Sequence, residues 1–191
     1  MKRQTLIIVI GFLCSMFAVS TLQAQMTSEV EALQQRWAEV NYLLKGKIQV
    51  EAFNTLIEDA RKVTDANSAN AEAWIWSGII RSSYAGAKGG LGALSAAKAA
   101  KADLEQGMAI NADALEGSAY TSLGVLYLNV PGWPVGFGDE EKGVEYLKKG
   151  LELSPAGIDS NYFYAEYLFK EDAYAESARY LNRALNAPAR P

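Results

Sequence analysis

The sequence contains no histidine and a single cysteine, Cys14. Without histidine it lacks the commonest general base and the commonest metal ligand. This excludes Ser-His-Asp and Cys-His catalysis and leaves only carboxylate, lysine or tyrosine chemistry. The sequence also has no calcium-loop pattern and no convergent acid–base pair. We therefore predict a protein that is not an enzyme and that needs no cofactor and no metal.

The first residues have the pattern of a secretory signal peptide. Lys2 and Arg3 precede an apolar run over residues 6–19, and Ala24 offers a small residue for cleavage. The run is shorter than the ~20 residues that a transmembrane helix needs, so an uncleaved anchor is the weaker alternative. We predict a signal peptide over 1–24 and one exported domain over 25–191, in a bacterial periplasm and with no stable membrane span after cleavage. Cys14 leaves with the signal, so packing rather than disulfides must hold the domain.

Charge gives no sign of a nucleic-acid partner. The chain has 18 basic and 22 acidic residues and a net charge of −4, and its basic residues form no evident patch. We therefore expect the protein not to bind nucleic acid.

An internal repeat organises the rest of the chain. Three segments each pair a helical pattern with a second one further on: 73–84 with 101–114, 119–128 with 141–155, and 161–169 with 173–188. A weaker copy spans 37–60. Asp139 is well placed to cap a helix start. The periodicity predicts helices over 28–44, 48–65, 71–85, 92–110, 114–129, 139–153, 158–170 and 173–186.

Small residues recur at matched positions of these units, and we predict that they mark the points where paired helices cross. A glycine inside a helix costs about 1 kcal/mol relative to alanine, so recurring helical glycines indicate a packing benefit. The predicted crossing pairs are Gly78 with Gly107, Gly124 with Gly150, and Ala165 with Ala184.

At these residues the sequence resembles the tetratricopeptide repeat family, whose unit is a helix pair of about 34 residues. The resemblance covers about 37–188 and departs from the family in two insertions, near 85–92 and 130–139. It implies an all-α, right-handed helical-hairpin solenoid of about four units. It also implies a scaffold that binds a protein or peptide partner in its concave groove. The matching residues are Trp37, Trp74, Gly78, Tyr120, Leu123, Gly124, Tyr127, Leu147, Gly150, Pro155, Ala165, Tyr174, Leu181 and Ala184.

In proteins of that family the first helix of each pair lines the concave side. Carried over unit by unit, this gives an apolar face with a few polar points, suited to an extended peptide, an amphipathic helix or a small apolar ligand. A C-terminal segment or a second copy covering the face is the alternative. The candidate groove residues are Tyr42, Ile75, Ile79, Val125, Leu128, Asn129, Tyr162, Glu166 and Phe169.

The inserted stretch VPGWPVGFGD places Trp133 and Phe137 in a loop. Either these rings fold back and plug a gap between neighbouring helix pairs, which we favour, or they contact a ligand. The other insertion, AGAKGGLG over 85–92, lacks the strand and the Gly-Lys-Ser/Thr run of a phosphate loop, so we predict a flexible connection.

A looser similarity links GFGDEEKG, residues 136–143, to periplasmic helical-repeat proteins that accompany TRAP-type solute transporters. It implies an alternative function, binding of a small molecule as a transporter component. A closed cavity walled by Ile79, Val125, Tyr162 and Phe169 would favour that alternative, and an open groove would favour a peptide.

Overall fold

The computed structural model describes residues 28–188, so the predicted signal peptide lies outside the described residues. Residues 28–38 form the N-terminal helix, which continues into the π-helical turn η1 (Glu39–Leu43). The following elements are α2 (Gly46–Ala66), α3 (Ala71–Lys88), α4 (Gly90–Ile110), η2 (Ala114–Gly117), α5 (Ser118–Asn129), α6 (Glu140–Leu153), α7 (Ile158–Lys170) and α8 (Tyr174–Leu185). The described part of the chain forms no β-strand beyond one isolated bridge.

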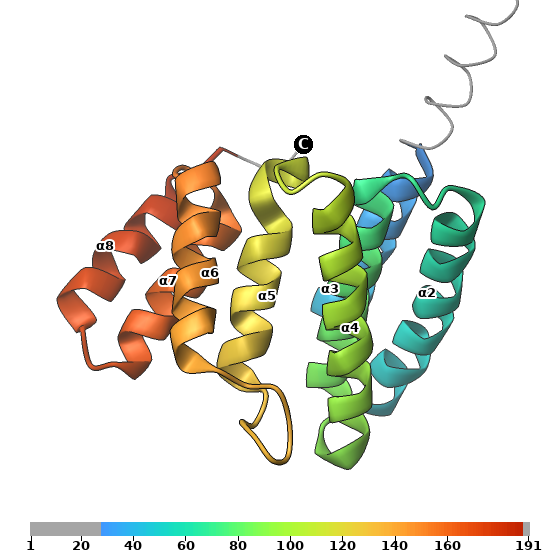
Figure 1. Cartoon of the computed structure of the whole chain (residues 1–191), viewed down its shortest axis with the longest axis horizontal. Helices are drawn as coiled ribbons and strands as arrows, with labels where there is room; N and C mark the ends of the chain where they lie inside the picture. The colour runs from blue at the N-terminus through green and yellow to red at the C-terminus, as the bar shows by residue number, and fades with distance from the viewer. Residues whose placement is uncertain (1–27, 189–191) are drawn as a thin grey trace, which may run out of the picture.

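The helices stand in one row from α2 at one end to α8 at the other (Figure 1). Each packs most closely on its neighbour in sequence, as α3 on α4, α5 on α6 and α7 on α8. The first helices of these pairs also touch along the row, α3 with α5 and α5 with α7. The predicted all-α solenoid of helix pairs is therefore confirmed.

Local signals account for most helix ends. Asn70 and Asp139 cap α3 and α6 by accepting hydrogen bonds from the amides of Ala73 (3.2 Å) and Lys142 (3.1 Å). The helix predicted over 114–129 begins later, at Ser118. It is preceded by η2, whose last residue, Gly117, has a φ of +75° that suits glycine.

The flexible connection predicted over 85–92 is wrong. Helix α3 continues to Lys88 and α4 begins at Gly90, so one residue joins them. That residue, Gly89, has a φ of +61°, which a side chain would disfavour. The insertion thus lengthens two helices, because the alanines among its glycines favour helix.

The four predicted crossing glycines do lie where paired helices meet, but each faces a side chain of the partner helix rather than the glycine predicted to pair with it. A methyl group on Gly78 would lie 2.5 Å from Cγ of Leu104, and one on Gly107 would lie 2.7 Å from Cγ1 of Ile75. Each glycine is a hole that receives an apolar knob from the partner helix, so α3 and α4 approach closely at two places.

The α5–α6 pair repeats this arrangement. Gly124 receives Leu147, where a methyl group would be 2.8 Å from Cδ2, and Gly143 receives Leu128. Gly150 lies against Thr121. The predicted pairings were therefore one helical turn out of register, although the helices they joined are correct.

The last pair uses alanine and serine at this point. Ala165 is fully buried, and the hydroxyl of buried Ser177 donates a hydrogen bond of 2.8 Å to its carbonyl. Ala184, its predicted partner, is only half-buried. The crossing of α7 and α8 is thus held by a side-chain hydrogen bond as well as by packing.

The core consists of neighbouring clusters between the N-terminal helix and α5. One cluster joins α3, α4 and α5 around Ile75, Leu104 and Leu123, and a second joins the N-terminal helix, α2 and α3 around Phe53, Leu56 and Ile80. Among residues 28–188, no helix is both long and apolar enough to cross a membrane.

Candidate functional site

The loop over residues 130–139 is closed on itself by backbone hydrogen bonds. The amides of Gly136 and Gly138 donate to the carbonyls of Gly132 (3.1 Å) and Pro131 (3.0 Å). The amide of Asp139 donates to the carbonyl of Tyr127 on α5 at 3.0 Å. Added methyl groups on Gly136 and Gly138 would collide with backbone carbonyl oxygens, so the chain can pass here only as glycine. The loop is therefore an ordered unit fixed to the end of α5.

Phe137 anchors this loop to the body of the protein. Its half-buried ring packs against the core cluster of α3–α5 and meets the ring of Tyr127 edge-on, with centroids 5.5 Å apart. Tyr127 in turn makes an edge contact with Tyr146 of α6 at 5.6 Å. Edge-on ring pairs contribute about 0.5–1.5 kcal/mol beyond the buried area, so this chain of rings fixes the loop.

Two lysines close the ring cluster from outside. Nζ of Lys142 lies 4.7 Å from the ring centre of Tyr127, and Nζ of Lys101 lies 5.9 Å from the ring centres of Tyr127 and Phe137. Hydrogen bonding to the Tyr127 side chain is the main cause that raises the pKa of Lys142. Burial lowers the pKa of Lys101, but the hydrogen bond and charge of Glu105 together with Tyr127 outweigh this, and the pKa is raised. Both ammonium groups thus remain charged over aromatic faces at neutral pH.

Trp133 lies at the other end of the loop and is 89% exposed. Its neighbour Val135 is also exposed. The loop hangs beyond the ends of α5 and α6, at the lower edge of the row in Figure 1. The two predicted loop residues therefore have different environments: Phe137 packs inward as the plug hypothesis expected, whereas Trp133 plugs nothing.

A recess of about 370 Å³ lies between the neck of this loop and the C-terminal end of α7. We call it the α5–α7 recess. Its lining is polar and apolar in similar measure: Leu128 and Val130 form an apolar floor, and Asp139, Glu140, Glu171 and Lys170 form a charged rim. Nζ of Lys170 bridges the two helices, 3.0 Å from Oε1 of Glu166 and 3.2 Å from Oδ1 of Asn129. The lining residues are Tyr127, Leu128, Val130, Gly132, Gly138, Asp139, Glu140, Tyr167, Lys170 and Glu171.

Chemically the recess is suited to binding. Burial, with the nearby charges of Glu171 and Glu140, raises the pKa of Tyr167, so its hydroxyl stays protonated at neutral pH. The charge of Lys170 is already balanced by Glu166, which leaves the rim acidic. Across residues 28–188, no group of three acidic, histidine or cysteine side chains is placed to hold a metal ion.

The predicted groove residues divide between two faces. Ile75 is fully buried against Gly107, and Leu128 packs against Gly143, so both turn toward the second helix of their own pair. Ile75 is therefore wrong as a groove residue, and the face is less apolar than predicted. Matching the chain to the repeat family therefore chose the correct helices. It placed these side chains about one residue step away from their actual position around the helix axis.

The remaining candidates have definite places. Val125 and Ile79 are half-buried, while Asn129 and Glu166 meet through Lys170 at the inner face of α5 and α7. Three aromatic candidates are exposed: Tyr42 beside Trp37, Tyr162 beside Phe163, and Phe169 beside Tyr174 of α8. Since Tyr162 and Phe169 are open to solvent, they and Ile79 and Val125 do not wall a closed cavity.

Sequence reasoning did not identify the residues that hold the loop and form the recess. Tyr127 was named only as a match to the repeat, and Tyr146, Lys101 and Lys142 were not singled out. Their role depends on contacts between segments far apart in the chain. One local signal was available in the sequence. Phe137 lies two residues before Asp139, the N-cap of α6, so its ring must lie near the start of that helix.

No protein-family model and no curated protein sequence matches this chain. Solved structures of low similarity include MamA, with a TM-score of 0.47 and 19% identity over 84% of this chain and 85% of that chain. The MamA RS-1 ArsTM double mutant has a TM-score of 0.45 and 21% identity, covering 88% and 90%. Pseudomonas aeruginosa pilF has a TM-score of 0.39 and 14% identity, covering 87% and 80%.

MamA and pilF are tetratricopeptide repeat proteins. These similarities are too low to bear on function, and the fold rests on the helix pairs described above. The looser similarity to proteins of TRAP-type transporters has no counterpart among these three.

Proposed function

We propose that this protein is a non-catalytic scaffold that binds a protein or peptide partner, and that the loop over 130–139 is its main contact. One observation carries the proposal: Trp133 is 89% exposed on a loop that is tied down by its own hydrogen bonds. Tryptophan is enriched among the residues that dominate binding energy at interfaces. A contact loop that is already ordered avoids the entropy cost of ordering on binding.

The α5–α7 recess supports the same proposal and specifies the partner's chemistry. A volume of about 370 Å³ accommodates one or two side chains, and the floor offers Leu128 and Val130. The rim adds Glu140 and Glu171 close to an already neutralised Lys170. We infer that the bound segment carries an apolar residue next to a basic one, since opposite charges at the rim favour correct docking.

We further propose that this binding takes place after export, in a bacterial periplasm. The basic start, the apolar run over 6–19 and the small residue Ala24 support that location. Sequencing the N-terminus of the protein purified from its host tests it: a mature chain starting at Gln25 is expected, and an intact Met1 would contradict it.

Site-specific photocrosslinking tests the contact. A photoreactive residue replaces exposed Val135, two positions from Trp133, in the otherwise wild-type protein and in a Trp133→Ala background. We expect a protein adduct in the first case and at least a tenfold loss of it in the second, because a central tryptophan contributes ~2 kcal/mol or more to binding.

A matched control places the photoreactive residue at exposed Lys47, in the first turn of α2. This position should give no adduct that depends on Trp133. An adduct at Val135 that survives Trp133→Ala would contradict the proposal. An adduct of small-molecule mass would support the small-molecule alternative instead.

A further inference from the structure

Helix α8 exposes an apolar stripe at the end of the row. Tyr174, Ala178, Leu181 and Leu185 recur at intervals of three and four and so share one face of the helix. All four are exposed, and Leu185 is 82% exposed. Phe169 of α7 extends the stripe, with its ring centre 5.3 Å from that of Tyr174.

The repeat itself shows what such a stripe accepts. Val144, Leu147 and Leu151 of α6 hold the matching places, counted from the small residues Gly150 and Ala184. In α6 these side chains are buried or half-buried, because helices α5 and α7 pack on either side. Among the described helices, α8 packs chiefly on α7, and no helix follows it as α7 follows α6. The stripe on α8 therefore has the form of a helix-binding face without its helix.

We propose that the occupant is α8 of a second copy of this chain, packed antiparallel about a two-fold axis. The stripe is symmetric about its own midpoint. An axis between residues 179 and 180 sets Tyr174 against Leu185 of the second copy, and Ala178 against Leu181. A small residue then faces a large one at the centre, which lets the helices approach closely. Two-fold pairs are by far the commonest oligomers.

Charge selects the antiparallel arrangement. The first turn of α8 carries Glu176, and its last turn carries Arg183, which the proposed axis sets against Glu176 of the second copy. Antiparallel pairing sets the acidic end of one helix beside the basic end of the other and also opposes the helix dipoles. Parallel pairing would bring like charges together at both ends.

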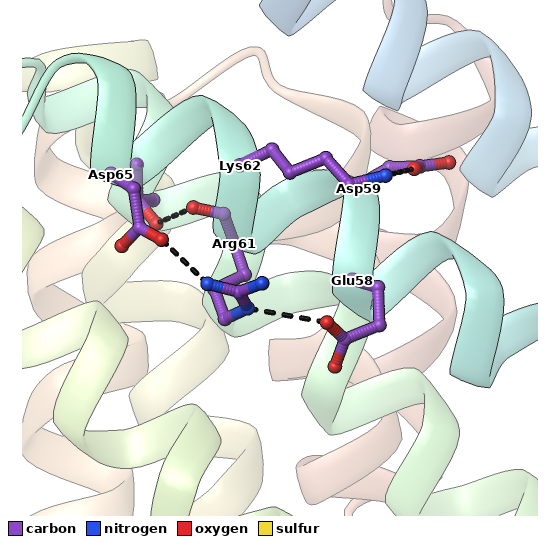
Figure 2. Close-up of polar contacts among 6 residues, drawn as sticks. Glu58, Asp59, Arg61, Lys62 and Asp65 are labelled. Atoms are coloured by element: carbon purple, nitrogen blue, oxygen red, sulfur yellow. Dashed lines mark hydrogen bonds and ion pairs between the residues drawn. The ribbon is translucent and has the colours of Figure 1, made fainter.

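Head-to-tail stacking onto the other end of the row is disfavoured by α2. Figure 2 shows Arg61 reaching Glu58 and Asp65 on the same helix, at 3.2 and 2.7 Å, and Lys62 reaching Asp59 at 2.9 Å. Covering this solvated network would remove several charges from water without providing new partners. The apolar stripe of α8 fits another apolar face better.

The area available indicates a weak, reversible dimer. Phe169 and Tyr174 are 59% and 55% exposed, and with Leu181 and Leu185 they offer on the order of 400 Å² of apolar surface per copy. A stable interface of standard size buries about 800 Å² per partner. We therefore expect dissociation at roughly 10–100 µM.

Sedimentation velocity of the purified protein over a concentration series tests the dimer. The wild type should shift from monomer to dimer across that range, and Leu185→Glu should remain monomeric at every concentration. The control is Leu43→Glu, at an equally exposed position (76%) at the other end of the row, which should dimerise like the wild type. Circular dichroism melting should be unchanged in both variants. A wild type that stays monomeric at roughly 500 µM, or a dimer that persists in Leu185→Glu, would overturn the proposal.

Cysteine crosslinking tests the antiparallel register, with the wild type as background. In the proposed pair two copies of residue 178 are offset by only about 4–5 Å along the axis, whereas two copies of residue 185 are offset by about 16–17 Å. A short bismaleimide should therefore join Ala178→Cys to itself and should not join Leu185→Cys to itself. Self-crosslinking of both variants would show a parallel pair, and failure of Ala178→Cys to join to itself would contradict the proposed register.

Discussion

The two aromatic residues of the 130–139 loop should differ sharply in their effect on stability. Replacing a fully buried phenylalanine by alanine costs about 3–5 kcal/mol. Phe137 is half-buried, and its edge contact with Tyr127 accounts for about 0.5–1.5 kcal/mol of its contribution. We expect Phe137→Ala to lower the free energy of unfolding by about 2 kcal/mol. Trp133→Ala should change it by less than about 0.5 kcal/mol, because the side chain is exposed.

Urea denaturation followed by far-ultraviolet circular dichroism measures both changes without relying on tryptophan fluorescence. In a domain of this size, ~2 kcal/mol corresponds to a fall in melting temperature of about 4–8 °C. Equal costs for the two variants would refute the division of the loop into an anchor and a contact. A loss above about 1.5 kcal/mol for Trp133→Ala would show that the tryptophan packs against the body of the protein after all.

Two further predictions concern the helix crossings. Gly124→Leu should lower the free energy of unfolding by about 2 kcal/mol or more in urea titrations, because the site is filled by Leu147. The matched control is Gly86→Ala, on an open helix surface. It should be neutral or stabilising by up to ~1 kcal/mol. Asp103→Ala should lower the free energy of unfolding by about 2–3 kcal/mol in the same assay. The Asp103 carboxylate accepts a hydrogen bond of 2.7 Å from Nε of half-buried Arg81, and removing the carboxylate leaves the Arg81 charge without its partner. A cost near zero would show that the pair is fully solvated.

Helix positions were predictable from the sequence because their signals are local. Apolar spacing, the Asp139 cap and the recurring glycines all act within a few residues. The stretch over 85–92 was mispredicted because its glycines were weighed more heavily than its alanines. There the packing of α3 on α4 continues beyond the usual length of the repeat and keeps both helices going.

Side-chain direction was harder to predict than helix position. Each residue step turns a helix by about 100°, so a small error in the carried-over register moves a side chain from the groove to the partner helix. Ile75 is the clearest case, since Gly107 on α4 provides the hole that it fills. The knob-and-hole match was visible in the sequence only as two glycines, and their partners are known only once the helices are docked.

The candidate site was only partly predictable for a related reason. The loop over 130–139 was recognised as unusual from its two large rings, but nothing nearby in the sequence separates Phe137 from Trp133. Phe137 is held by Tyr127 and by Lys101, which belong to α5 and α4. The recess depends on α7 as well. Contacts at such sequence distance arise from the stacking of three helix pairs.

Hydrogen exchange of the loop amides, followed by NMR, tests the central claim that an ordered loop presents an exposed tryptophan. The amides of Gly136, Gly138 and Asp139 donate to backbone carbonyls and should exchange at least about 100-fold more slowly than in an unfolded chain. Exchange of these three amides at the unfolded rate would show that the loop is not ordered in the free protein, and would contradict the account.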